Sequence, residues 1–404
     1  MKRRAFLTSV MSALSLAETV KANEDQLKKN GKSAILLWMG GGPSTMDIWD
    51  LKSGAPTGGP FRPIATSGDV QISEHMPLMA KQMHNAAVIR SMSTREADHM
   101  RGRYYMHTGY VPNPSIDHPS YGSVISHQLK REDIAIPQFI SVGGGSMGAG
   151  FLGAKYNPFS VNSDGRIRNL NMKIDERFYQ RAYALDAIEN NFISQKRGSL
   201  AKEHQAILKE TFNVLTSSQM DALKVASEPE NVKERYGDNN FGKGCLMARR
   251  LVEAGVPFIE VNLGGWDNHQ NIFPTLRDTK LPMLDQGMSA LYEDLEQRGL
   301  LQDTAIIWMG EFSRTPRING NAGRDHWARS WSVVVGGAGM NGGIAIGETN
   351  SDGTRVESEP HTSQDVMASV CKALGISLGT TFTSNSGRPM KIANSGKVIA
   401  ELFG

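Results

Sequence analysis

Two polar loops hold the residues whose types and spacing could do chemistry. One loop follows an apolar run that ends at Leu263, and the other follows an apolar run that ends at Met309. Their acidic and imidazole side chains are Asp267, His269, Glu311, Asp325 and His326. Carboxylates and imidazoles with no thiolate nearby can bind a divalent ion such as Zn²⁺, Mn²⁺ or Ca²⁺. Such an ion polarises a phosphoryl, sulfuryl or acyl oxygen and lowers the pKa of a bound water, so the pattern indicates metal-assisted hydrolysis.

Four further residues are candidates for the same site. Arg314 and Arg324 lie in the second loop and could hold an oxyanion through a bidentate guanidinium. His99, in the charged segment EADHMRG, is a further candidate metal ligand. Ser44 follows three glycines, and it could act as a nucleophile, bind the ion or cap the next segment. A hydrogen-bonded network that only fixes the loops would use the same residue types, so both interpretations stay open.

The elements that must position these residues are buried strands. Nearly continuous apolar runs are typical of parallel strands that are covered on both faces. Six such runs are predicted as strands: 33–39, 86–89, 136–142, 256–263, 305–309 and 332–336. The carboxyl ends of parallel strands form the ligand crevice of an α/β sheet. We therefore expect the two polar loops to meet at one edge of one sheet.

Helical patterns separate the strands. Residues 276–298 have apolar side chains at helical spacing, with Pro282 in the expected first turn and Gly299 as the expected stop. With a strand before and after it, this helix forms a βαβ unit, which should be parallel and right-handed. Further helices are predicted over 72–85, 121–129, 239–254 and 362–374.

Residues 175–235 differ in character from the rest of the chain. Over most of this segment, charged residues alternate with apolar ones at near-helical spacing, without a strand pattern. The segment is predicted as a helical insertion or lid. Residues 23–404 are otherwise expected to form one α/β domain.

Residues 1–22 have the pattern of an export signal. The pair Arg3 and Arg4 precedes a mildly apolar stretch, and Val20-Lys21-Ala22 offers a small-residue cleavage site, which is typical of a twin-arginine signal peptide. The apolar stretch spans about a dozen residues, whereas a membrane helix needs about 20, so no stable transmembrane segment is expected. The protein is therefore predicted to be exported by the twin-arginine route and to be periplasmic or extracellular.

Charge and cysteine content exclude several classes of partner and site. The chain has a net charge of +3, and residues 1–22 also carry +3, so the remainder is close to neutral. Long-range attraction to nucleic acid or to an anionic membrane is therefore not expected. The only two cysteines, Cys245 and Cys371, are too few for a disulfide framework or a thiolate zinc cluster.

Four segments resemble a known family. The segments GGGPSTMDIWD, EADHMRG, RRLVEAGVPFIEVNLGGWDNH and WMGEFSRTPRINGNAGRDHW are similar to the exported bacterial domain of unknown function 1501 proteins, and the similarity runs over essentially the whole mature chain. The resemblance implies the fold of the alkaline phosphatase and sulfatase superfamily, a three-layer sandwich with a mostly parallel sheet between helices. The family brings no established activity with it.

The superfamily's metal pattern matches this sequence in part. Asp267-x-His269 looks like a shortened form of the superfamily's Asp-x-x-x-His pair, and His326 resembles its final metal histidine. Met39 stands beside the place of the superfamily's first metal aspartate, and the formylglycine motif of sulfatases is absent. Glu311-Phe312 replaces its Asp-His pair. The resemblance therefore implies one metal site formed by Asp267, His269 and His326, with Asp325 as a further candidate ligand.

Two functions follow as hypotheses. The first is an exported metal-dependent hydrolase of phosphate or sulfate esters, acting on a small-molecule or glycan ester, with Glu311 as a ligand or general base. The second is an exported binding or assembly protein that retains the fold without turnover. A redox role is weaker, because no cofactor motif is visible.

Overall fold

The computed structural model describes the chain apart from residues 1–30, 168–174, 195–204 and 206–215. Its centre is an eight-stranded sheet with the order β12-β4-β11-β8-β1-β7-β5-β6. Strand β11 pairs antiparallel with both of its neighbours, and every other pairing in this sheet is parallel. In this order the strands span Ala345–Ile346, Ala86–Met92, Trp331–Gly337, Thr304–Met309, Ser33–Trp38, Phe258–Asn262, Phe139–Val142 and Phe159–Val161.

The central strands are covered on both faces. All six residues of β1 are buried. Because successive side chains point to opposite faces of a strand, Ile35 and Leu37 join one hydrophobic core, whereas Ala34 and Leu36 join the other. The predicted strands covered on both faces are confirmed.

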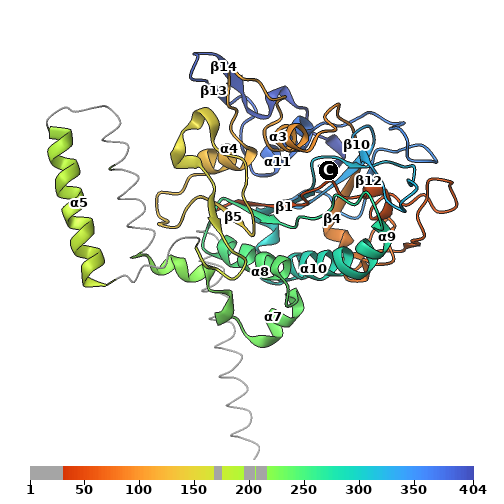
Figure 1. Ribbon diagram of the computed structural model, residues 1–404, viewed down its shortest axis with the longest axis horizontal. Helices are drawn as coiled ribbons and strands as arrows, with labels where there is room; N and C mark the ends of the chain where they lie inside the picture. Colours follow the sequence, from red (N-terminus) through yellow and green to blue (C-terminus); the bar gives the residue numbers. More distant parts are fainter. Residues whose placement is uncertain (1–30, 168–174, 195–204, 206–215) are drawn as a thin grey trace, which may run out of the picture.

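Helices form a layer on each side of the sheet (Figure 1). The core on one side includes residues of α2 (Pro77–Ala80), α7 (Glu230–Tyr236), α8 (Asn240–Glu253) and α10 (Leu281–Gln297). The core on the other side includes residues of α3 (His99–Thr108), α4 (Tyr121–Gln128) and α11 (Ser363–Ala373). The predicted three-layer α/β class is therefore confirmed.

The observed helix of the βαβ unit begins and ends close to the predicted positions. Helix α10 has Pro282 in its first turn, and Gly299 follows its end with φ of 67°. The shorter helix α9 (Ile272–Thr275) and a π-helical turn (Leu276–Lys280) precede it. Strands β7 and β8 are parallel but not adjacent, since β1 lies between them.

The predicted surface helix over 72–85 is wrong. The segment instead contains β3 (Ile72–Ser73), which pairs with β2 (Pro63–Ile64), followed by α2 and a short 3-10 helix (Met83–Asn85). Met76, Met79 and Met83 are fully buried. Their spacing suggested a helical stripe, but here it reflects short turns packed into the core beside α10.

Part of the predicted helical insertion is described. Helix α5 (Glu176–Ser194) stands apart from the layers, and two short 3-10 helices (Ser218–Leu223 and Val225–Ser227) lead to α7 (Figure 1). The boundaries 175–235 stay a prediction, and the signal-peptide prediction lies outside the described residues. In the described part of the chain, no helix has the length and apolar character needed to cross a membrane.

The loops that carry the candidate residues converge because of the strand order. Strands β1, β7 and β8 are neighbours and parallel, so the loops after them leave the same edge of the sheet. Strand β11 runs in the opposite direction, so its amino end lies at that edge too. The two-stranded sheet of β9 (Ser313–Arg314) and β10 (His326–Trp327) lies between β8 and β11 in sequence. The remaining strands, β13 (Thr381–Thr383) and β14 (Pro389–Lys391), pair with each other.

Candidate metal centre

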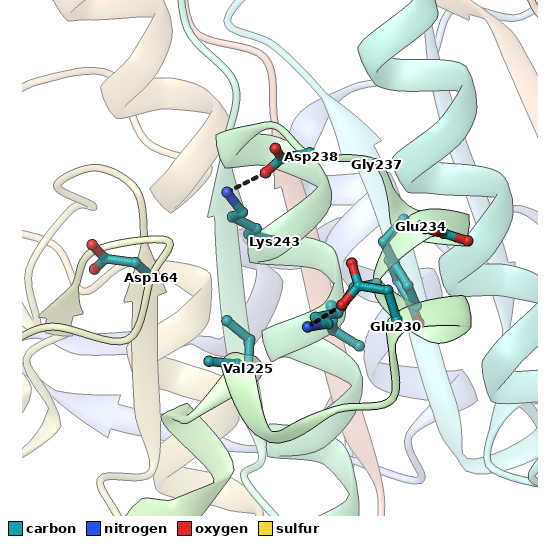
Figure 2. Close-up of a pocket in the computed structure, with 11 residues that line it drawn as sticks. Asp164, Val225, Glu230, Glu234, Gly237, Asp238 and Lys243 are labelled. Carbon is teal, nitrogen blue, oxygen red and sulfur yellow. Dashed lines mark ion pairs between the residues drawn. The ribbon is translucent and has the colours of Figure 1, made fainter.

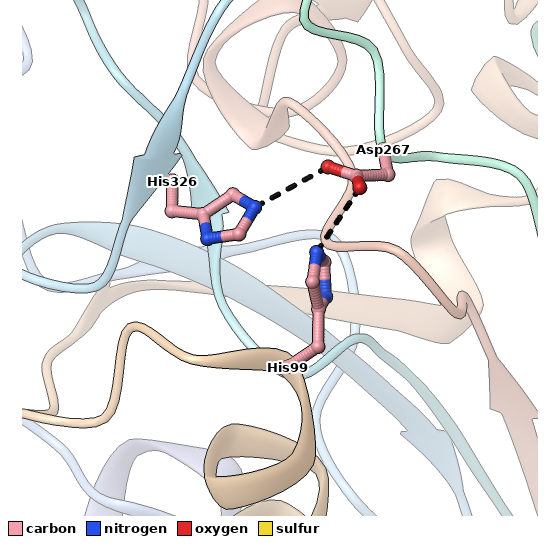
Figure 3. Close-up of side chains that lie close together, drawn as sticks. All are labelled: His99, Asp267 and His326. Atoms are coloured by element: carbon pink, nitrogen blue, oxygen red, sulfur yellow. Dashed lines mark hydrogen bonds and ion pairs between the residues drawn. The ribbon is translucent and has the colours of Figure 1, made fainter.

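Three imidazoles surround the carboxylate of Asp267. Its Oδ2 atom lies 3.2 Å from His99 Nε2. Its Oδ1 atom lies 2.9 Å from His269 Nε2 and 3.3 Å from His326 Nε2. Figure 3 shows His99 and His326 pointing at this carboxylate from two different elements. The structure therefore brings together four of the predicted metal ligands.

The other ring nitrogen of each histidine faces an oxygen. His99 Nδ1 lies 2.6 Å from Glu311 Oε1, and His269 Nδ1 lies 2.7 Å from Asp325 Oδ1. His326 Nδ1 lies 3.0 Å from the carbonyl oxygen of Ala97. An oxygen acceptor at Nδ1 fixes the proton there and leaves the lone pair of Nε2 free for a metal ion. The arrangement places Asp325 behind His269, as a group that orients a ligand.

Local sequence features explain how His99 and His269 reach their places. Helix α3 begins at His99, and the Asp98 side chain accepts a hydrogen bond from the backbone N–H of Arg101, which caps the helix. The loop with His269 packs tightly against Gly323, where an added Cβ atom would lie 2.1 Å from the His269 carbonyl carbon. A side chain at position 323 would therefore displace this imidazole.

Arg314 connects Asp267 to the glycine loop after β1. Its guanidinium is buried, lies 2.6 Å from Asp267 Oδ1, and donates to the carbonyl oxygens of Gly41 and Gly42. Burial is the largest single influence and raises the pKa of the Asp267 carboxyl, but the charge and hydrogen bond of Arg314, together with the charges of His99 and His269, outweigh it and lower that pKa. Burial lowers the pKa of Arg314 itself. Asp267 is thus held as a carboxylate, which is the form that binds a metal ion.

Glu311 supports both His99 and the loop after β1. Its Oε1 atom accepts a hydrogen bond from the backbone N–H of Gly41 at 2.9 Å and contacts His99, and this contact raises the pKa of His99. Gly41 has φ of +115°, and a Cβ atom there would lie 2.6 Å from the Asp267 backbone nitrogen. Only glycine therefore allows this approach.

The donor set fits a transition-metal ion. Ligand atoms of His99, Asp267 and His326 all lie within 4.8 Å of one another. Tetrahedral ligands at about 2.0–2.2 Å from an ion are roughly 3.3 Å apart, close to the separations around Asp267. His99 Nε2 is buried and makes no hydrogen bond, although it lies 3.2 Å from Asp267 Oδ2, so a bound ion would give it the partner it lacks. Two imidazoles and one carboxylate, with His269 Nε2 beside the same carboxylate, suit Zn²⁺ or Mn²⁺ better than Ca²⁺, which prefers six to eight oxygens.

Ser44 and Arg324 both bind the buried carboxylate of Asp47, apart from the metal centre. The Ser44 hydroxyl donates to Asp47 Oδ2 at 2.6 Å, and Arg324 binds both oxygens of Asp47 at 2.8 and 3.0 Å. All three side chains are almost completely buried. Their predicted roles as nucleophile and oxyanion holder gain no support from this placement, because these polar groups already have partners inside the protein.

The sequence missed several groups that shape the centre. Phe312 is buried, and its ring centroid lies 5.0 Å from that of His99 and 4.9 Å from that of His326. The sequence suggested only that Phe312 replaces a ligand, whereas the structure shows that its ring packs against two imidazoles. The Ala97 carbonyl and the Gly41 N–H are backbone groups, so no sequence pattern could have indicated them.

A cavity lies beside α7 and α8, and none of the predicted site residues lines it. Figure 2 shows this cavity of about 420 Å³, bordered by α7 and α8. Its charged rim contains the ion pairs Lys243–Asp238 and Lys233–Glu230, at 2.5 and 2.6 Å. Both lysines are therefore paired within the rim, and neither is an unpaired cation for a phosphate or sulfate.

The fold and the cluster define an α/β protein with a candidate metal centre at the carboxyl edge of its sheet. A family model described as "Protein of unknown function (DUF1501)" matches residues 31–403. The chain belongs to this family, as its sequence segments predicted. A search of curated proteins found no match.

Several solved structures are similar to this chain. Ps i-CgsB is 11% identical with a TM-score of 0.41, and the match covers 91% of this chain and 75% of that chain. An alkaline phosphatase superfamily protein from Vibrio parahaemolyticus is 11% identical with a TM-score of 0.38, covering 91% and 69%. The alkaline phosphatase from the Antarctic bacterium TAB5 is 16% identical with a TM-score of 0.40, covering 86% and 98%. At these scores the similarity carries nothing about activity.

Proposed function

We propose that this protein is an exported, metal-dependent hydrolase of phosphate or sulfate esters. The observation that carries the proposal is the convergence of three imidazole Nε2 atoms on one carboxylate, with each Nδ1 atom held by an oxygen acceptor. A network that only fixed the loops would not require all three rings to present the same nitrogen to one carboxylate.

The chain supplies a complete set of ligands and supports. His99, Asp267, His269 and His326 would hold the ion, and the groups that orient them are Glu311, Asp325 and the Ala97 carbonyl. A bound ion would polarise the ester oxygen and lower the pKa of a water. Arg314 keeps Asp267 ionised and oriented. Glu311 orients His99 through Oε1, and its buried Oε2 atom has no hydrogen-bond partner, so Glu311 stays the candidate general base.

The exposed rim fits a substrate that approaches from solvent. The side chain of Asp267 is 44% exposed and that of His269 is 46% exposed, so the cluster is open to a small-molecule or glycan ester. Residues 1–22 would direct the folded protein to the periplasm or the cell exterior.

The alternative is a non-catalytic binding or assembly protein. The placement of Ser44 favours it, because the buried hydroxyl is bonded to Asp47 and would have to be released before it could attack a substrate. Under the hydrolase proposal, a water must serve as the nucleophile instead.

The test is metal analysis followed by a substrate screen. Full-length protein would be purified after export, and its metal content measured by mass spectrometry. We expect about one divalent ion per chain, lost in His269→Ala and in His326→Ala but kept in His84→Ala, an exposed histidine paired with Glu296. Hydrolysis of 4-nitrophenyl phosphate or sulfate should then depend on the ion. A stable protein that takes up no divalent ion would refute the hydrolase and favour the alternative.

A further inference from the structure

The two arginines expected to bind an oxyanion are already engaged. Arg314 contacts Asp267 and two backbone carbonyls, and Arg324 contacts Asp47 and three backbone carbonyls. Both side chains are fully buried. A phosphate or sulfate group at the metal centre would therefore need another cation.

Arg103 occupies the right place in the fold. It follows His99 by four residues in α3, so the two side chains share one face of the helix, about 6 Å apart along its axis. One turn later on this face, His107 Nε2 lies 3.4 Å from Glu260 Oε2 in the central strand β7. This face of α3 thus runs from the metal centre to the middle of the sheet, with Arg103 between them.

The guanidinium of Arg103 lacks a charged partner. Its Nη2 atom donates to the carbonyl oxygen of Gly145, and its Nε atom is buried without a hydrogen-bond partner. Within the part of the chain that the structure describes, no carboxylate forms an ion pair with it, whereas Arg101 on the same helix pairs with Glu96 at 2.6 Å. A planar guanidinium with unpaired donors is well suited to the oxygens of a phosphate or sulfate.

The glycine loop after β5 fixes this side chain. Gly143 has φ of +75°, and a Cβ atom on Gly144 would lie 2.8 Å from the Asn262 side chain. These two glycines let the loop fold onto the carboxyl end of β7, where the Gly145 carbonyl meets Arg103. The loop therefore positions the guanidinium rather than neutralising it.

We infer that Arg103 binds the non-bridging oxygens of the substrate's phosphate or sulfate group and so restricts the site to anionic esters. The inference rests on the proposed function, and it names the residue that selects the substrate. The ester group would lie between the imidazole of His99 and the guanidinium of Arg103, which project from successive turns of the same helix.

The test measures anion binding separately from metal binding. Inorganic phosphate and sulfate would be titrated into the full-length protein by calorimetry, with and without the bound divalent ion. We expect Arg103→Ala to weaken binding of the anion about tenfold to a hundredfold, Arg103→Lys to weaken it less, and Arg101→Ala to leave it unchanged. The metal content of all three variants should equal that of the unaltered protein.

A second measurement does not depend on the variants. In the unaltered protein, phosphate should protect Arg103 from modification by phenylglyoxal, as measured by peptide mass spectrometry, and should leave the labelling of Arg101 unchanged. Equal phosphate affinity in Arg103→Ala, or modification of Arg103 that phosphate does not slow, would overturn the inference even if the metal centre is real. Loss of the metal centre alone would instead appear as absent metal, with the anion titration still reporting on Arg103.

Discussion

Two buried arginines in one loop region form ion pairs that differ in what surrounds the carboxylate. Arg324 binds Asp47, which is 1% exposed and whose oxygens also accept from the Ser44 hydroxyl. Arg314 binds Asp267, whose side chain is 44% exposed and is shared with three imidazoles. The carboxylate of Asp47 has buried partners from the protein on both oxygens. The carboxylate of Asp267 is open to solvent and contacts three imidazole nitrogens.

This difference shows that the arginine does not determine whether such an ion pair is structural or takes part in ligand binding. Both guanidinium groups are buried and bind backbone carbonyls of neighbouring loops. The carboxylate of Asp47 can exchange no partner without unfolding its surroundings, but that of Asp267 can exchange an imidazole contact for a metal ion. We therefore expect the first pair to govern stability and the second to govern ligand binding.

The largest expected effect is that of Asp47→Ala on stability. Removal of this carboxylate leaves the Arg324 charge buried without a counter-ion, which costs about 3–5 kcal/mol in comparable cases. Denaturant unfolding measured by circular dichroism would give the change in the free energy of unfolding. A decrease in the free energy of unfolding of less than about 1 kcal/mol would contradict this comparison, because it would show that the Asp47–Arg324 pair is not structural.

Removal of the metal ion should have the next largest effect. An ion at a free concentration of about 100 times its Kd stabilises the folded protein by about 2.7 kcal/mol. Thermal unfolding with and without a chelator would show this increment in the unaltered protein and in His84→Ala. His326→Ala should lack it, and an equal increment in His326→Ala would place the ion elsewhere.

Asp325→Asn should weaken metal binding without abolishing it. The carboxylate holds His269 from behind, and loss of such a contact lowers metal affinity about 10–100-fold. Competition with a zinc-binding dye would measure the change in Kd. An effect as large as that of His269→Ala would instead identify Asp325 as a direct ligand, as the sequence also allowed.

Ser44→Ala should give the smallest effect. The hydroxyl donates to a charged carboxylate, so its loss should lower the free energy of unfolding by about 1.5 kcal/mol. Values of kcat/KM for whichever ester the protein hydrolyses should stay within about twofold, because the stability change alone leaves the folded fraction almost unaltered. A loss of turnover with retained metal would restore Ser44 as a nucleophile.

Much of the fold could be predicted from the chain. The apolar runs that end near Leu263 and Met309 are strands, and Pro282 and Gly299 mark the beginning and the end of the helix between them. The segment around Met79 could not be predicted, because methionines at helical spacing fit a buried series of short turns equally well. The clustering of His99 with His326 was only partly foreseeable, since these residues belong to different elements far apart in sequence.

The sequence by itself determined which segments are strands and which residue types meet at their ends, because burial on both faces and the chemistry of metal ligands are properties of short segments. Only the tertiary structure determined that the Asp267 side chain is exposed while that of Asp47 is buried. The partners of Asp47 include Arg324, 277 residues away, and the strand order that brings such residues together depends on packing between distant elements. Local sequence patterns do not encode that exposure.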